Sequence, residues 1–233
     1  SFGNLFLAAM CDVSGDFVTA IEKMSSVLAV TGNVLPVTKD DVNLVGVLRD
    51  GSRIVGESHI PVAAAEKHSP IDHIELLPED VVPFDRCIAA INDADIIILG
   101  PGSLYTSIIP NLLVDGIAFA LAASAAKKVY VCNVMTQPGE TDGFSAYDHV
   151  AAIEKHMGGN YIDYCIANSG DIPPQAAVKY EEQNSVPVRL DKSRFDGCRT
   201  ELIEKNLVFY DKENLIVRHD YVKLAREILR LCM

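Results

Sequence analysis

The hydrophobic pattern of the chain is most continuous at 96–99, Ile-Ile-Ile-Leu. Consecutive large apolar residues, mostly β-branched, are typical of a central parallel strand that helices cover on both faces. The strand pattern ends at Gly100. Pro101 and Gly102 then predict a tight turn, with Ser103 as the N-cap of the helix that follows. Because the start of a helix presents free N–H groups and a positive dipole end, we expect an anion there, with phosphate as the first candidate.

Strand and helix patterns alternate beyond this turn. Helical spacing over 113–124 and 145–157 separates strand patterns at 128–133 and 162–167, and the links between them are short. This order is typical of right-handed βαβ units. We therefore predict an α/β protein with a Rossmann-like three-layer α/β/α fold and a mainly parallel, doubly wound sheet.

The predicted sheet places three polar segments at one edge. They are the loops 100–106 and 133–141 and the turn that starts at Asn168, each directly after a strand pattern. Ligands of open parallel sheets bind beyond the carboxyl ends of the strands, so these segments can converge on one ligand. We expect that ligand to be phosphorylated or a nucleotide.

The N-terminal part has a different pattern. Helical spacing at 1–10, which looks buried, and at 15–24 is followed by a short buried strand pattern at 27–30. Asp50-Gly51 lies between two β-rich runs and predicts a hairpin over about 43–60, inserted into the parallel fold or placed at its edge. The chain starts directly in a helical pattern and without a methionine, so we expect the natural protein to begin earlier.

The C-terminal part is predicted to be less regular. We expect a strand at 186–190, an antiparallel pair at 207–210 and 215–217, and a final helix that Asp220 caps. Residues 1–233 are predicted to form a single domain.

Composition and charge narrow the classes of function. Of the 233 residues, 49% are hydrophobic and 22% are charged, which is typical of a globular protein. The net charge of −12 argues against nucleic-acid binding and against anionic membranes, because both require a cationic surface. No apolar stretch is as long as the roughly 18 residues that a membrane span needs. We therefore expect no nucleic-acid partner, no membrane insertion and a cytoplasmic location.

Candidate reactive residues give little support for catalysis by this chain. The six cysteines are scattered without a Cys-x-x-Cys pair, so we expect reduced and mostly buried thiols rather than disulfides or a metal site. Ser103 lacks the second flanking glycine of a nucleophile elbow. His149 follows Asp148 on an amphipathic helix, where we expect a solvent-exposed side chain rather than a proton relay. No catalytic residue and no metal ligand is predicted.

Two long motifs resemble one protein family. Residues 100–114 read Gly-Pro-Gly-Ser-Leu-Tyr-Thr-Ser-Ile-Ile-Pro-Asn-Leu-Leu-Val, and residues 133–141 read Asn-Val-Met-Thr-Gln-Pro-Gly-Glu-Thr. Together with the start at 1–5 and the Arg218-His219-Asp220 junction, these motifs resemble the CofD-like family. Within that family the chain is similar to the YvcK branch of gluconeogenesis or morphogenesis factors, over essentially its whole length.

The resemblance implies a Rossmann-like fold, a cytoplasmic bacterial location and the binding of nucleotide diphosphate compounds. In the YvcK branch these are UDP-linked sugars such as UDP-N-acetylglucosamine, and the role is control of cell shape under gluconeogenic growth. A CofD-type enzyme, the first alternative, transfers 2-phospho-L-lactate from a GDP-linked donor to a deazaflavin, and only this alternative implies Mg²⁺. The second alternative is a scaffold with a vestigial cleft. A homodimer and protein partners of cell-wall synthesis are further expectations.

The resemblance also has a gap at its start. Family members begin with a Gly-rich strand and turn that cradles phosphate, and with an Asp-Asp-Gly-Gly segment that serves metal binding and catalysis. Neither segment occurs in this chain. We therefore expect nucleotide-sugar binding without an assigned catalytic group.

The candidate ligand-binding residues come from the sheet-edge loops and from the family motifs. The glycines and serine of the first loop are expected to contact a diphosphate, and the polar side chains of the second loop to contact sugar or ribose hydroxyls. The resemblance implies that Tyr180 stacks on the nucleotide sugar and that Arg218 makes a bidentate contact to phosphate. The full set is Asn4, Gly100, Gly102, Ser103, Tyr105, Thr106, Asn133, Thr136, Gln137, Asn168, Tyr180 and Arg218.

Overall fold

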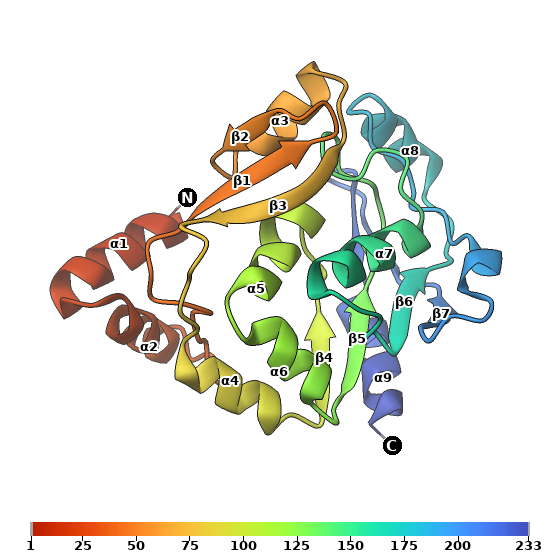
Figure 1. The fold of residues 1–233 in the computed structure, drawn as a ribbon. Helices are drawn as coiled ribbons and strands as arrows, with labels where there is room; N and C mark the ends of the chain where they lie inside the picture. The colour runs from red at the N-terminus through yellow and green to blue at the C-terminus, as the bar shows by residue number, and fades with distance from the viewer. Residues whose placement is uncertain (1, 233) are drawn as a thin grey trace.

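The computed structural model describes residues 2–232 and has a four-stranded parallel sheet at its centre (Figure 1). The sheet has the strand order β4-β5-β6-β7. Neighbouring strands pair in parallel throughout. Its members are β4 (Ile96–Leu99), β5 (Lys127–Val131), β6 (Tyr164–Asn168) and β7 (Glu201–Lys205).

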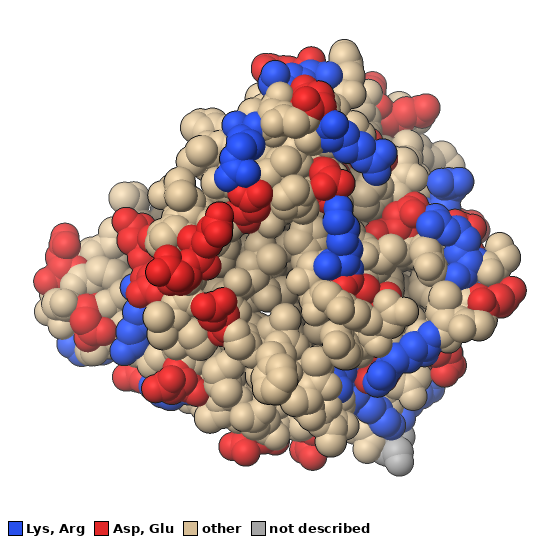
Figure 2. Space-filling model, in the orientation of Figure 1, with Lys and Arg blue, Asp and Glu red and all other residues tan. Residues whose placement is uncertain are grey.

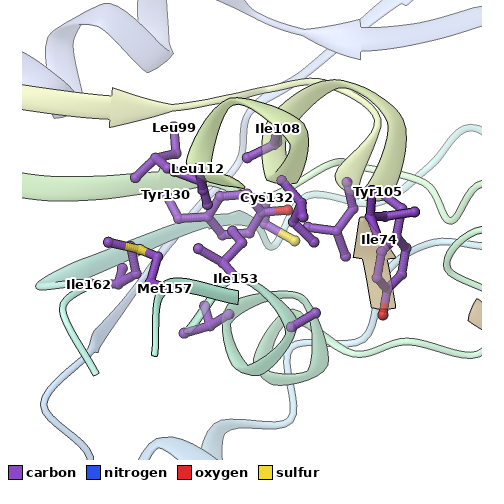
Figure 3. Close-up of a cluster of buried hydrophobic side chains, with 14 of the residues drawn as sticks. Ile74, Leu99, Tyr105, Ile108, Leu112, Tyr130, Cys132, Ile153, Met157 and Ile162 are labelled. Carbon is purple, nitrogen blue, oxygen red and sulfur yellow. The ribbon is translucent and has the colours of Figure 1, made fainter. Parts of the chain in front are cut away.

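Helices cover both faces of this sheet. The short helices η1 (Leu104–Ile108), α5 (Ile109–Leu113) and α6 (Ile117–Ala123), together with α7 (Ala146–Met157), lie in front of it in Figure 1, and α9 (Tyr221–Leu231) lies behind. The main core fills the front layer, where buried side chains of the sheet and helices interlock (Figure 3). The Rossmann-like three-layer α/β/α prediction is confirmed, although the single helix predicted at 113–124 is divided between α5 and α6.

Strand β4 lies at one edge of the parallel sheet. Its apolar run predicted a central strand, and that prediction is wrong. The strands follow one another in chain order, so the first of them is outermost among the described residues. The order also does not reverse within residues 2–232, as it would in a doubly wound sheet. The side chain of Ile98 is accordingly 43% exposed. A continuous apolar run therefore marks a strand here without fixing its place in the sheet.

A second, antiparallel sheet contains the predicted hairpin. Its strands are β1 (Asn43–Leu48), β2 (Arg53–Val55) and β3 (Ile71–Leu77), in the order β2-β1-β3. The hairpin is confirmed, but its second strand ends well before residue 60. Gly56 has φ of +102°, which breaks the strand, and α3 (His59–Glu66) follows.

The N-terminal helices are confirmed as α1 (Phe2–Ser14) and α2 (Phe17–Val27), although Ser1 lies outside the described residues. Asp16 caps α2 by accepting hydrogen bonds from two backbone N–H groups. The predicted burial of the first helix is wrong, since no residue of α1 is buried. The strand predicted at 27–30 is also wrong, because Val27 still belongs to α2 and the next residues form an exposed turn.

The C-terminal ribbon and helix are confirmed, and one strand was missed. Strands β8 (Val208–Asp211) and β9 (Ile216–His219) pair in antiparallel fashion, and Asp220 caps α9. The segment 186–190 forms isolated bridges only, and β7 takes the fourth place in the parallel sheet. The sequence of β7, Glu-Leu-Ile-Glu-Lys, is too charged to show the apolar pattern of a buried strand, so no strand was predicted there. The remaining elements are α4 (Asp85–Asn92), α8 (Pro174–Glu181) and η2 (Lys192–Phe195).

The cysteines and His149 test two predictions about reactive side chains. All six cysteines are free, as predicted, but Cys198 and Cys232 are exposed and only Cys132 and Cys165 are fully buried. His149 is fully buried, which contradicts its predicted exposure. Its Nδ1 lies 2.8 Å from the Ser145 carbonyl, and its ring packs edge-on against Phe144. The helix face that carries His149 therefore points into the core.

Charged side chains are unevenly distributed over the surface. Acidic side chains gather at the left of the molecule, near α1 and the segment leading to α4, whereas the surface over α6 is largely uncharged (Figure 2).

Within residues 2–232, no single helix has the length and apolar composition needed to cross a membrane. Only the bent pair Leu104–Leu113 and Ile117–Ala123 meets these criteria, with its two parts 81° apart.

Candidate functional site

The first two predicted loops meet at the carboxyl edge of the parallel sheet. The turn after β4 and the loop after β5 are joined by side-chain hydrogen bonds. Asn133 donates from its side-chain amide to the carbonyl of Gly102 over 2.9 Å, and Gln137 donates to the Ser103 hydroxyl over 2.8 Å. A third bond, from Asn133 Nδ2 to Gln137 Oε1 over 3.2 Å, links the two donors. These two loops therefore form one rigid rim, as the parallel topology predicts.

A cleft of about 860 Å³ opens beside this rim. The two loops form one wall, and α8, β9 and the start of α9 form the others. Seven of the predicted ligand-binding residues line it. They are Gly102, Ser103, Asn133, Thr136, Gln137, Tyr180 and Arg218.

Side chains from β9 and α8 complete the cleft. The hydroxyl of Tyr180 accepts a hydrogen bond from the Val217 N–H over 3.2 Å, which fixes α8 against β9. Arg218 is exposed, and its guanidinium makes no hydrogen bond or ion pair to any residue within 2–232. It is therefore available to an anionic ligand, and it is not paired with Asp220, whose carboxylate caps α9.

His219 is a cleft residue that the residue-by-residue prediction missed. Its Nε2 lies 3.1 Å from the carbonyl oxygen of Cys132, to which it donates. Burial lowers the pKa of His219, so the neutral imidazole is favoured near pH 7. His219 belongs to the Arg218-His219-Asp220 junction of the family motifs, and its position at the end of a predicted strand was the signal that could have identified it.

Charge distinguishes the cleft from the rest of the surface. Arg218 is the only Lys or Arg among its described lining residues, and no Asp or Glu lines it. The chain as a whole has a net charge of −12. A cleft without carboxylates in so acidic a chain is suited to an anionic group, because the local potential is set by the arginine and by polar N–H and O–H donors.

Three residues of the first loop do not face the cleft. Gly100 lies on the far side of the turn, where a Cβ would come within 3.1 Å of the Val131 carbonyl, so its role is close packing. Tyr105 is buried, with its ring between Phe144 and His156 and toward Ile74 (Figure 3). Its backbone N–H and the Thr106 hydroxyl both donate to Glu140, at 3.0 Å each.

This arrangement changes the expected anion site. Ser103 occupies the N-cap position of η1, but its side chain makes no capping hydrogen bond. The carboxylate of Glu140, in the neighbouring loop, accepts hydrogen bonds at the start of η1 instead. The Tyr105 N–H and the Thr106 hydroxyl are therefore already engaged, whereas Gly102 and Ser103 line the cleft.

Asn168 and Asn4 also lie away from the cleft. The side chain of Asn168 accepts from the N–H groups of Gly170 and Leu207 and donates to the Gly170 carbonyl, so it holds the turn after β6. Asn4 belongs to α1, which lies at the left in Figure 1, far from α8 at the upper right.

The described residues do not fit a bound Mg²⁺. No group of three or more His, Cys, Asp or Glu side chains within 2–232 is arranged to hold a metal ion, and the cleft has no carboxylate to serve as a ligand.

Comparison with known proteins places these motifs in a family. A family model described as 2-phospho-L-lactate transferase CofD matches residues 1–208. The chain belongs to the CofD family. Within that family it groups with gluconeogenesis factors, as the sequence motifs predicted. The Gluconeogenesis factor of Bacillus subtilis is 45% identical over 231 residues, which are 99% of this chain and 71% of the relative.

Other relatives of the CofD family agree in sequence and in fold. A relative from Clostridium acetobutylicum, provisionally given the same name, is 48% identical over 233 residues. The match covers 100% of this chain but 51% of the relative, so the chain spans about half of that protein's length. A crystal structure of a UPF0052 family member from Bacillus halodurans is 41% identical, with a TM-score of 0.91. It covers 98% of this chain and 72% of the other.

Proposed function

We propose that this chain forms the binding site of a nucleotide-sugar-binding protein, with a UDP-sugar such as UDP-N-acetylglucosamine as ligand. The observation that carries the proposal is the carboxylate-free cleft, which is lined by Arg218 together with Gly102 and Ser103. A diphosphate needs local positive potential and N–H or O–H donors, and this cleft has both. The net charge of −12 makes a general anion-binding surface a poor alternative.

The remaining lining residues suit the uncharged parts of such a ligand. Thr136, Gln137 and Gln183 have polar groups for sugar or ribose hydroxyls, and Tyr180 lies in the wall with its hydroxyl already engaged by β9. Aromatic rings bind bases and sugars by stacking, whereas amides and hydroxyls fix orientation. We further propose a cytoplasmic location and a role in cell-shape control during gluconeogenic growth. The names of the gluconeogenesis-factor relatives support the link to gluconeogenesis alone.

Calorimetric titration of the full-length protein with UDP-N-acetylglucosamine tests the proposal. We expect saturable binding that other UDP-sugars compete for and that Arg218→Ala weakens. No heat, together with no competition by any UDP-sugar, would contradict it. If a protein partner were then captured equally well with and without nucleotide, a scaffold with a vestigial cleft would be the better explanation.

A second candidate is a CofD-type 2-phospho-L-lactate transferase. The match of residues 1–208 to the transferase family model favours it. Among the described lining residues no carboxylate is placed to hold a metal ion, and His219 is the one histidine that could act as a general base. Formation of a phospholactyl-deazaflavin from the GDP-linked donor, with full-length protein and Mg²⁺, would establish the transferase. Binding of UDP-sugars without that product supports the first proposal.

A further inference from the structure

Glu140 is a buried carboxylate placed at the start of helix η1. Glu140 is only 6% exposed, and its carboxylate accepts hydrogen bonds from the Tyr105 N–H and the Thr106 hydroxyl. It makes no ion pair with any residue within 2–232. A buried carboxylate without a cationic partner is costly unless hydrogen bonds hold it, so these two contacts determine where it lies.

The hydrogen bonds to Glu140 belong to a set of contacts that holds the loop after β4 against the loop after β5, and we call these contacts clamps. Asn133 and Gln137 hold the first loop at Gly102 and Ser103, and Glu140 holds it two residues later. All three side chains come from the single loop that follows β5. The first loop supplies only backbone groups and hydroxyls to these contacts.

The position of Glu140 decides which N–H groups reach the cleft. A helix start attracts an anion, and here the protein supplies one of its own at Tyr105 and Thr106. The amides of Gly102 and Ser103 donate to no described residue, and both residues line the cleft. A ligand diphosphate is therefore directed to the segment before the helix, between the two clamped ends.

We infer that Glu140 is a positioning residue of the cleft, which holds the start of η1 so that the Gly102 and Ser103 amides face the ligand. This inference rests on the proposed function in one respect, since the ligand is taken to be an anion. Glu140 itself does not line the cleft and is not expected to touch the ligand.

The hydrogen-bond pattern allows a test by two substitutions. In Glu140→Gln the side-chain carbonyl can accept from the Tyr105 N–H and the amide can donate to the Thr106 hydroxyl, so the clamp is kept without the charge. Glu140→Ala removes it. Ile162→Val is the stability control, because Ile162 is fully buried in the core and lies outside the cleft.

Two measurements are made on the full-length protein. Calorimetry with UDP-N-acetylglucosamine is expected to give a Kd about tenfold weaker for Glu140→Ala, because hydrogen bonds to a charged group are lost. Wild type, Glu140→Gln and Ile162→Val are expected to agree within about threefold. Hydrogen exchange at the Tyr105 amide is expected to be faster in Glu140→Ala than in the other three proteins.

Each outcome decides the inference. Equal exchange in Glu140→Ala and wild type overturns it, as does faster exchange with an unchanged Kd, since the clamp would then not serve the ligand. Equal weakening in Glu140→Gln also overturns it, because charge and not hydrogen bonding would be responsible. If wild type binds no UDP-sugar, the proposed ligand fails, and the exchange of Tyr105 alone decides whether Glu140 holds the loop.

Discussion

The side-chain amide of Gln137 donates a hydrogen bond to the hydroxyl of Ser103 over 2.8 Å, which ties the loop after β5 to the turn after β4. The same Gln137 accepts from the Asn133 amide. Ser103 thus keeps its own O–H free to donate into the cleft, and the rim is organised before any ligand arrives. Preorganised donors bind more tightly because less freedom is lost on binding.

Gln137→Leu is predicted to loosen this rim. Two partly buried hydrogen bonds are lost, so the free energy of unfolding is expected to fall by about 1–2 kcal/mol, and UDP-sugar affinity by about tenfold. Urea denaturation and calorimetry measure the two effects. Gln183→Leu is the control for stability, because the Gln183 side chain lines the same cleft without a hydrogen-bond partner among the described residues. Equal stability losses in both variants would contradict the clamp.

Arg218→Ala is predicted to reduce affinity for a UDP-sugar by about tenfold or more, because a charged hydrogen bond contributes about 1.5–3 kcal/mol. Arg218→Lys is expected to be intermediate, since it keeps the charge but not the bidentate geometry. Arg226→Ala makes the same charge change on the exposed side of α9, outside the cleft, and should leave Kd unchanged. Equal effects at the two arginines would show that net charge, not the cleft, determines affinity.

UDP-sugar binding is predicted to strengthen as pH falls from 8 toward 6. Burial lowers the pKa of His219 in the free protein, and a nearby diphosphate would favour its protonated form. Binding then takes up a proton at His219. The variant His219→Gln can still donate to the Cys132 carbonyl but cannot titrate, so its Kd should be flat over this range. A pH dependence that persists in this variant would assign the effect to another group.

Protein stability is predicted to fall as pH drops below about 6.5, the ordinary pKa of histidine. His156 Nδ1 donates to the Ala152 carbonyl, so its Nε2 must be unprotonated to accept from the Ile74 N–H. Burial, as the largest cause, lowers the pKa of His156 and likewise that of His149. The folded state therefore binds fewer protons than the unfolded state, and stability that is present above about pH 6.5 is lost as pH falls toward the folded-state pKa.

Urea denaturation at pH 7.5 and 5.5 measures this loss, which should be smaller in His156→Gln. Asp72 does not interfere, because hydrogen bonds from His73 and Lys155 lower its pKa to about 2, and its contribution is lost only below its ordinary value of 3.8. An identical decline in His156→Gln and wild type would exclude His156 as a cause.

Most strands and helices of the fold could be predicted from periodicity, because each has a strong local pattern. The exceptions have tertiary causes. The edge position of β4 depends on strand order, which its own residues do not encode, and β7 is recruited by pairing with β6 despite its charges. His149 is buried because its helix face meets Phe144 and the core, and a helical pattern alone does not show how deeply a helix is packed.

The candidate site was predictable to a similar degree. Strand topology correctly brought Gly102, Ser103 and the loop after β5 together. It could not show that Glu140, 35 residues after Tyr105, would occupy the helix start that was assigned to a phosphate. Long-range polar contacts of this kind depend on side-chain geometry, so they appear only once the fold is built.

The position of Arg218, the only Lys or Arg among the described residues that line the cleft, has a kinetic consequence. A dianion approaching a chain of net charge −12 is repelled at long range and attracted only within the last few ångströms. Added salt screens the long-range repulsion over a Debye length of about 10 Å at 0.1 M. The association rate of a nucleotide ligand should therefore rise with ionic strength, opposite to the behaviour of proteins that steer anions with a basic surface.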